Sequence, residues 1–315
     1  MTGYILRRLL HSVVVVIGVT IIVFIIVHLL PGGPARALLG SRASPQQIQS
    51  FDAVNGYNKP IPVQYIDYLY RLIHGNLGYS YHYNQTVASL LSQYLPKSAL
   101  LVGLSYVVAL VVAIPLGILQ ALQRNKPVDY ALTSVAFVGY SMPAFWLGII
   151  LILVFAVTFH LLPPEGPQGA TVTAVLSQPT ALVLPVITLA AATVALFSRF
   201  MRSSAIETLV QDYIRTAKAK GLSGRRIVVR HVLRNSLTPI ITLIGLSLPG
   251  TVSGAVITES VFNYPGMGLL FWTAAVTHDF PILLGFTIVV AVATVLGSLT
   301  ADVLYAVADP RVRYA

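Results

Sequence analysis

The chain has 315 residues, of which 56% are hydrophobic and 10% are charged, and its formal net charge is +10. A soluble domain normally has about 25% charged residues, so this composition excludes an ordinary soluble globule and favours a protein that crosses a membrane several times. The absence of cysteine excludes disulfides, catalytic thiolates and cysteine-based zinc sites.

The first predicted element is an apolar helix over residues 9–30. A membrane helix needs about 20 mainly apolar residues, and this stretch has that length. It exceeds the roughly 7–15 apolar residues of a signal peptide, so we expect an uncleaved span. Five further stretches qualify, which predicts an all-α polytopic membrane protein with six transmembrane helices. They are residues 98–122, 131–162, 181–197, 237–261 and 281–307.

The loop between the first two spans, residues 31–97, contains signals for two helices. Ser44, Pro45 and Gln47 form a capping-box pattern, and Gly56 could end the helix that they begin. Residues 62–74 place apolar side chains on one face of a second helix: Tyr65, Ile66, Leu69, Leu72 and Ile73. We expect a small cap that packs on the membrane part; the alternative is a lid that contacts no ligand.

The third and fourth spans have unusual lengths. The third is longer than one crossing needs, and Pro143 interrupts it, which predicts a tilted or broken helix. The fourth is at the short end of the range, so we expect its helix to continue beyond the bilayer.

A basic loop, residues 199–236, follows the fourth span and holds nine of the 20 Lys and Arg residues. Apolar residues recur at helical spacing from 203 to 220, and Gly221 permits the left-handed conformation that ends helices. Ser223 can cap a second, short helix that carries arginines with apolar residues between them. The loop is too small for a catalytic domain.

Lys and Arg residues indicate the orientation of the spans. Six spans place both termini on one side, and 15 of the 20 basic residues then share that side with the basic loop. Because basic residues accumulate on the cytoplasmic side, the termini and the basic loop are predicted to be cytoplasmic.

Three interpretations of the basic loop compete. It could lie on anionic membrane lipid, where each basic residue contributes about 1 kcal/mol. Nucleic-acid binding is disfavoured, because the stretch has one Tyr and offers no stacking platform. The third interpretation is a docking element for a subunit that supplies energy, and the glycine joint between two amphipathic helices favours it.

Chemistry within the chain is sparse. It has no G-x-x-x-x-G-K-[ST] motif for ATP phosphates, no H-E-x-x-H motif and no His cluster at metal-ligand spacing. Charged residues inside spans mark ion or proton pathways, and here only Glu259 and Asp302 lie near span ends. We expect these two acids to have structural partners rather than to couple protons.

The segment YIRTAKAKGLSGRRIVVRHVLRNSLTP resembles the cytoplasmic EAA loop of ABC-importer permeases, in the form of the dipeptide/oligopeptide group. The residues that match are Tyr213, Arg215, Thr216, Ala217, Lys220, Gly221, Leu222, Ser223, Arg234, Asn235, Leu237 and Pro239. The chain departs from the general E-A-A pattern, because Arg215 and Thr216 stand where Glu and Ala are usual.

Other segments resemble the same group over nearly the whole chain. They are YILRRLL, HLLPGGPAR, PVQYIDYLYRLIHGNLGYS, TESVFNYPGMG and DVLYAVADPRVR. Gly33 and Asn76 replace acidic residues that are common in the group. The outer loop is typical of the B-type permease subunit rather than the C-type.

The resemblance implies a type I ABC importer in which this chain performs no bond chemistry. Its implied partners are a homologous C-type permease, one or two kinds of ATPase that bind ATP and Mg, an extracytoplasmic binding protein and a peptide substrate. It implies the cytoplasmic (inner) membrane of a bacterium or archaeon as the location, and residues 222–233 as a coupling helix whose apolar residues fill an ATPase cleft. The expected coupling residues are Tyr213, Arg215, Ala217, Gly221, Leu222, Ser223, Arg225, Arg226, Val229 and Arg230.

The translocation path is expected at the third and fifth spans. Candidate residues are Tyr140, Ser141, Pro143, Trp146, Ser253, Thr258 and Glu259. The alternative for most of them is ordinary packing between helices, where small and hydroxyl residues are common.

We expect three parts along the chain: a first span with the outer cap (1–97), a permease core (98–308) and a cytoplasmic tail (309–315). Within the family, a nickel, glutathione or haem importer is the alternative to a peptide importer. A standalone channel or secondary carrier is disfavoured by the scarcity of charge in the spans.

Overall fold

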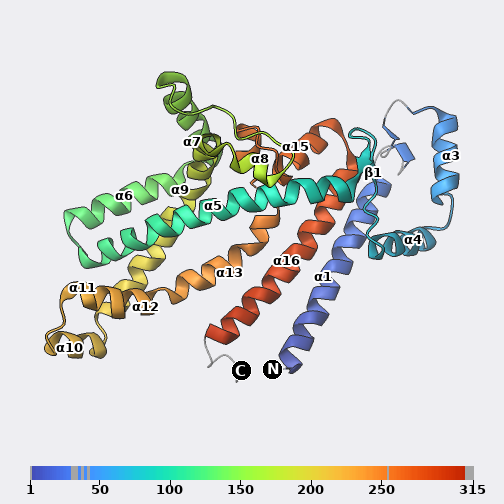
Figure 1. Ribbon diagram of the computed structural model, residues 1–315. Coiled ribbons are helices and arrows are strands. Elements are labelled where there is room, and N and C mark those ends of the chain that lie inside the picture. Colours follow the sequence, from blue (N-terminus) through green and yellow to red (C-terminus); the bar gives the residue numbers. More distant parts are fainter. Residues whose placement is uncertain (1, 30–34, 37–38, 41–42, 254, 309–315) are drawn as a thin grey trace.

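The structure, a computed structural model, describes residues 2–29, 35–36, 39–40, 43–253 and 255–308 (Figure 1). The predicted tail, residues 309–315, and the end of the first span at residue 30 lie outside the described residues. The helices of the first half are α1 (Thr2–Leu29), α3 (Pro45–Asn55), α4 (Ile61–Ile73), α5 (Val87–Leu122), α6 (Pro127–Ser141), α7 (Ala144–Leu151) and the π-helix η1 (Ile152–Thr158).

The helices of the second half include one further π-helix, η2. They are α8 (Val172–Leu176), α9 (Pro179–Leu209), α10 (Asp212–Ala219), α11 (Gly224–Ile227), η2 (Val228–Val232), α12 (Leu233–Ser236), α13 (Thr238–Ser253), α14 (Val256–Val261), α15 (Met267–Thr277) and α16 (Phe280–Ala308). Two short strands, β1 (Tyr79–Ser80) and β2 (Gln85–Thr86), pair antiparallel in the outer loop.

Long helices that pack side by side form the body of the molecule. Helix α1 runs beside α16, and the first turn of α1 lies at the same end as the last turn of α16 (Figure 1). Helix α5 packs along α9, where Gly117 permits a close approach. A Cβ atom added at Gly117 would lie 2.6 Å from the Met201 Cβ atom and 2.6 Å from the Ser198 carbonyl oxygen. Small residues at such crossings allow membrane helices to pack tightly.

Four helices of the described residues are long and apolar enough to cross a membrane: 87–122, 179–209, 224–245 and 280–298. The bent pair α6 and α7–η1 raises the number to five if it counts as one span. The first predicted span is helical in α1, which has 28 residues, and Val13–Ile26 is its described apolar stretch. The membrane architecture is therefore supported, while the count of six stays a prediction.

The break predicted at Pro143 is confirmed. Helices α6 and α7–η1 meet at an angle of 103°. Met142, the residue before the proline, has ψ 128°, which is the extended conformation that a following proline imposes. The fourth span is longer than its apolar stretch, as expected, because α9 has 31 residues.

Two predicted helices are interrupted. The helix expected over residues 203–220 breaks at Gln211, whose ψ of 149° is extended, so that α10 can turn its apolar face toward α9. The fifth predicted span, 237–261, is divided into α13, described to Ser253, and α14, which begins after the non-helical Ala255. The fifth span was also predicted to begin at residue 237, but the chain is already helical from Gly224. The short basic segment α11–η2–α12 therefore continues directly into α13.

The outer cap has both predicted helices. Ser44 and Gln47 form the capping box, and Gly56 ends α3 with φ +75°. Helix α4 packs on α1, where the Tyr65 hydroxyl lies 2.9 Å from the Thr20 hydroxyl. The cap is therefore attached to the membrane part. On the predicted apolar side of α4, Ile66 and Ile73 are exposed, and the buried side chain of this helix is that of Gln64.

Candidate functional site

The basic loop forms a two-helix hairpin at the end of α9 (Figure 1). Gly221 joins α10 to α11 with φ +75°, as the sequence predicts. Ser223 occupies the N-cap position of α11 with an extended backbone, but its side chain makes no capping hydrogen bond. The Asn235 side-chain amide donates to the Tyr213 hydroxyl over 3.2 Å and ties the second helical segment back to the first.

One face of this hairpin is buried within the chain. Ile214 and Ala217 of α10, with Ile227 and Val232, pack on Ala121 and Ala205 of the long helices α5 and α9. Leu222 packs against the edge of this cluster. Ile227 and Val232 are therefore core residues of this chain here and not apolar side chains that a partner can bury. The cluster fixes the hairpin rigidly to α5 and α9.

The opposite face is exposed and basic. Val229 has 59% of its surface exposed and Tyr213 has 43%. The other predicted coupling residues that are exposed are Arg215, Gly221, Ser223, Arg225, Arg226 and Arg230. The structure thus places most of the predicted coupling residues on the exposed face of one small hairpin. Ala217 instead lies on its buried face, in the cluster that packs on α5 and α9.

An ion pair with a buried carboxylate, which no local sequence pattern indicates, braces the same end of the molecule. The Arg202 guanidinium of α9 donates from Nε to Asp129 Oδ1 over 2.8 Å and from Nη2 to Oδ2 over 2.7 Å. Asp129 is 2% exposed, and the Asn125 backbone N–H also donates to its carboxylate. Such bidentate pairs hold two elements in one geometry. Here they hold α6 against the last turns of α9, next to the hairpin.

We expect Asp129→Asn to lower the thermal stability of the purified protein. The amide cannot accept both guanidinium hydrogen bonds, and hydrogen bonds to charged groups contribute about 1.5–3 kcal/mol. Asp212→Asn is the matched control, because the Asp212–Arg215 pair is 3.2 Å long and both side chains are at least 75% exposed. A melting curve in detergent should show a shift for the first variant only. Equal shifts would contradict the bracing role.

The predicted pathway residues do not share one surface. Tyr140, Ser141, Pro143 and Trp146 are exposed around the bend between α6 and α7. Thr258 and Glu259 are instead buried inside the chain. Ser253 belongs to α13, and its side chain is outside the described residues, as is that of Asp302 in α16. The bend residues are therefore the pathway candidates that another molecule can reach.

Glu259 is a structural acceptor at the start of α15. Its carboxylate accepts hydrogen bonds from the Gly268 N–H over 2.7 Å, the Leu269 N–H over 3.2 Å, the Ala255 N–H over 3.1 Å and the Ser98 hydroxyl over 2.7 Å. The first two are free N–H groups of the first turn of α15, which favour a negative charge. The expectation of structural partners is confirmed for this acid, and its burial argues against a place on the path surface.

The P-G-x-G segment needs glycine at positions 266 and 268 because the chain there lies directly against α14. A Cβ atom at Gly268 would lie 2.5 Å from the Val256 Cα atom, and one at Gly266 would collide with the Glu259 carboxylate. The Tyr264 hydroxyl donates to the Lys97 carbonyl oxygen over 2.7 Å. Together these contacts fasten α14 and α15 to α5. Helix α15 was not among the predicted elements, although the apolar run from Met267 is a signal for it.

Two family models match the chain. One, described as a binding-protein-dependent transport system inner membrane component, matches residues 113–314. The other describes the N-terminal part of membrane components of the same transport systems and matches residues 1–102.

Curated relatives match over almost their full length. The oligopeptide transport system permease protein AppB of Bacillus subtilis (strain 168) is 38% identical and covers 100% of both chains. The probable D,D-dipeptide transport system permease protein DdpB of Escherichia coli (strain K12) is 39% identical, with 97% of this chain and 96% of the relative covered. The dipeptide transport system permease protein DppB of the same strain is 34% identical, with 100% and 99% covered.

A solved structure shares the fold. It is a chain of the methionine ABC transporter MetNI in an inward-facing conformation, with a TM-score of 0.53 and 16% identity. The match covers 70% of this chain and 96% of the other. At this identity it supports the arrangement of the helices.

Proposed function

The chain belongs to the family of binding-protein-dependent transport system inner membrane components, and on this premise we propose that its cargo is di- and oligopeptides. It is a multi-pass membrane permease subunit of an ABC importer. Relatives named for oligopeptides, dipeptides and D,D-dipeptides, at 34–39% identity over nearly full length, support the peptide class.

The basic loop carries the proposal of how the subunit is driven. The exposed face with Arg225, Arg226, Val229 and Arg230 stands on a buried cluster that connects it to α5 and α9. A movement imposed on this face would therefore move two long helices as rigid bodies. We propose that partner ATPases, which bind ATP and Mg, dock there, with Val229 buried and the arginines facing acidic side chains.

The remaining partners follow from the same scheme. A homologous C-type permease would complete the path, and an extracytoplasmic binding protein would deliver peptide to the outer side. The excess of basic residues on one side supports cytoplasmic termini and a bacterial or archaeal cytoplasmic membrane. In this scheme the chain is non-catalytic, because bond cleavage belongs to the ATPases.

We expect Val229→Asp to weaken the association with the ATPases about tenfold, since it places an unpaired charge in a buried contact. Val210→Asp is the matched control. Val210 is 58% exposed on the same loop but lies outside the predicted coupling segment. Co-purification of ATPases with the tagged chain measures the effect. Equal recovery with both variants would place the docking surface elsewhere.

The function as a whole is tested by purifying the tagged chain from its native membrane in mild detergent. Partners are identified by mass spectrometry, and ATP hydrolysis is measured with binding protein and candidate peptides. A second permease, ATPases and peptide-stimulated hydrolysis are the expected results. If nickel, glutathione or haem stimulates ATP hydrolysis and peptides do not, that solute is the cargo and the peptide assignment is wrong. A chain recovered alone that conducts solute without ATP would overturn the importer and leave the basic loop as a lipid anchor.

A further inference from the structure

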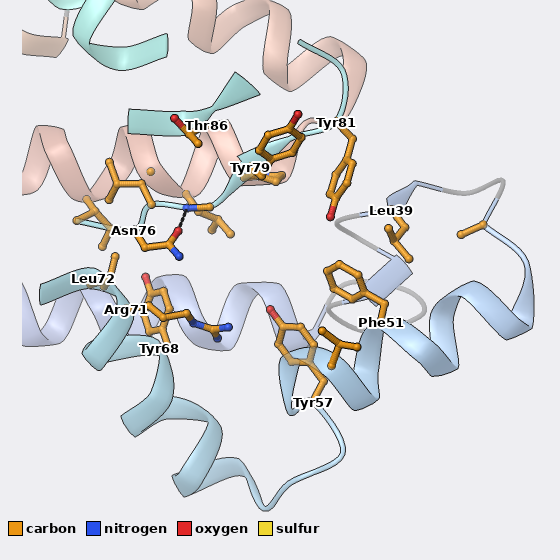
Figure 2. A pocket seen from close by; sticks show the side chains of 18 of the residues that line it. Leu39, Phe51, Tyr57, Tyr68, Arg71, Leu72, Asn76, Tyr79, Tyr81 and Thr86 are labelled. Carbon is orange, nitrogen blue, oxygen red and sulfur yellow. Dashed lines mark hydrogen bonds between the residues drawn. The ribbon is translucent and has the colours of Figure 1, made fainter. Parts of the chain in front are cut away.

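The outer cap forms one side of an open pocket that no part of the transport scheme uses. It has a volume of about 1000 Å³ and lies between α3, α4, the β1–β2 hairpin and the first turns of α16 (Figure 2). This is at the upper end of the roughly 300–1,000 Å³ typical of small-molecule sites. Its walls come from segments as far apart in the chain as Leu39 and Ile288, so it exists only in the folded protein.

The walls combine aromatic rings with one positive charge. Five aromatic side chains line the pocket: Phe51, Tyr57, Tyr68, Tyr79 and Tyr81. Arg71 is the charged side chain among the described residues that line it, and within these residues it forms no ion pair. Figure 2 shows its guanidinium group directed between Tyr68 and Tyr57. A half-buried cation without a counter-charge favours an anionic ligand, because desolvation of the cation is then compensated.

Two tyrosines beside Arg71 stay neutral donors. Burial raises the pKa of Tyr57 although Arg71 opposes the shift, and burial together with Tyr65 raises the pKa of Tyr68 to about 12. The Tyr68 hydroxyl oxygen is buried and has no hydrogen-bond partner within the described part of the chain. Native structures rarely leave a buried hydroxyl without a partner, so an unpaired one beside a cation indicates a ligand group.

We propose that this pocket binds a short peptide by its terminal carboxylate, with Arg71 as the anchor. The inference rests on the proposed peptide cargo and adds a second, outer site for it. A planar guanidinium matches a carboxylate with two parallel hydrogen bonds. The aromatic walls cover apolar side chains of the peptide. The amide oxygens of Gln47 and Asn76 accept from the Ser44 and Gly78 N–H groups, so their NH₂ groups can donate to carbonyl groups of the peptide backbone.

Placement in the cap favours a free peptide as the occupant. The pocket lies on the outer side, where substrate arrives, and the cap is attached to α1 and reaches α16. A captured peptide would be held beside the outer mouth between rounds of delivery. An acidic side chain of the binding protein could pair with Arg71 in the same way. The experiment must therefore distinguish a bound peptide from a docked binding protein.

The test uses the assembled transporter in lipid nanodiscs without binding protein. Titration calorimetry compares alanyl-leucyl-phenylalanine with its C-terminal amide on the native complex, on Arg71→Gln and on Lys59→Gln. Lys59→Gln is the matched control, since this substitution also removes one positive charge from the cap. Lys59 lies outside the pocket and pairs with Asp67 over 2.8 Å. We expect Arg71→Gln, and amidation of the peptide, each to weaken binding about tenfold, as loss of a charge-assisted hydrogen bond does. Lys59→Gln should bind like the native complex.

Two outcomes overturn the proposal. One is equal affinity for the acid and the amide, or for Arg71→Gln and the native complex. The other is an Arg71→Gln variant that binds peptide normally but loses affinity for the binding protein, which assigns Arg71 to protein docking. Peptide-stimulated ATP hydrolysis of the native complex is measured in parallel, with binding protein added. If that stimulation is present while Arg71 has no effect, the pocket assignment alone fails; if it is absent, the peptide cargo itself fails.

Discussion

Glu259→Ala is expected to prevent stable assembly of the permease. The substitution removes the acceptor of three backbone N–H groups and of the Ser98 hydroxyl in a place with no exposed surface. Each buried donor left without an acceptor costs about 1–3 kcal/mol, and native proteins have only about 5–15 kcal/mol of net stability. The measurement is the amount of monodisperse protein that can be extracted from the membrane.

Glu259→Gln separates this structural role from a role in proton coupling. The glutamine keeps the size of the side chain and one carbonyl oxygen, but its NH₂ group faces donors. We expect an intermediate loss of thermal stability, while protein that does fold transports normally. A Glu259→Gln variant of native stability that transports poorly or loses a pH dependence would instead identify Glu259 as a pathway residue. Gly268→Ala should resemble Glu259→Ala, because its Cβ atom would strike the Val256 backbone.

Gly221→Val is expected to uncouple ATP hydrolysis from transport in a complex that still assembles. An added Cβ atom meets nothing within 4 Å at this position, so the effect comes from the backbone alone. With φ +75°, a β-branched residue is strained by about 1–2 kcal/mol or more and would change the angle between α10 and α11. The exposed docking face would then be misaligned with the buried cluster that carries its movement. We expect peptide uptake into proteoliposomes to fall about tenfold, because a strain of about 1.4 kcal/mol corresponds to a tenfold change in an equilibrium.

Gly221→Asn is the matched control for this prediction. Asparagine adopts the left-handed conformation far more readily than valine, and there is space for its side chain. Uptake and its ratio to ATP hydrolysis should therefore stay near the native values. If valine and asparagine reduce uptake equally, the size of the side chain at a partner contact matters, and the backbone argument is wrong.

Local signals in the sequence determined the class of fold and several joints of this protein. The bilayer demands long apolar helices, so the hydropathy of residues 98–122 or 181–197 was sufficient to predict a helix there. Pro143 bends its span and Gly221 ends α10 because backbone conformations forced by these residues need no distant partner. The capping box at Ser44 is equally local.

Tertiary structure alone decided the features that depend on distant contacts. Ser98 and Glu259 are 161 residues apart, and Asp129 and Arg202 are 73 residues apart, so no local pattern announces either partnership. Ile227, Val229 and Val232 look alike in the sequence, yet packing on α5 and α9 buries two of them and leaves Val229 exposed. The Arg71 pocket likewise exists because α3, α4, the hairpin and α16 meet around it. Helix formation is local in the chain, whereas burial, pairing and enclosure are set by which helices fold against one another.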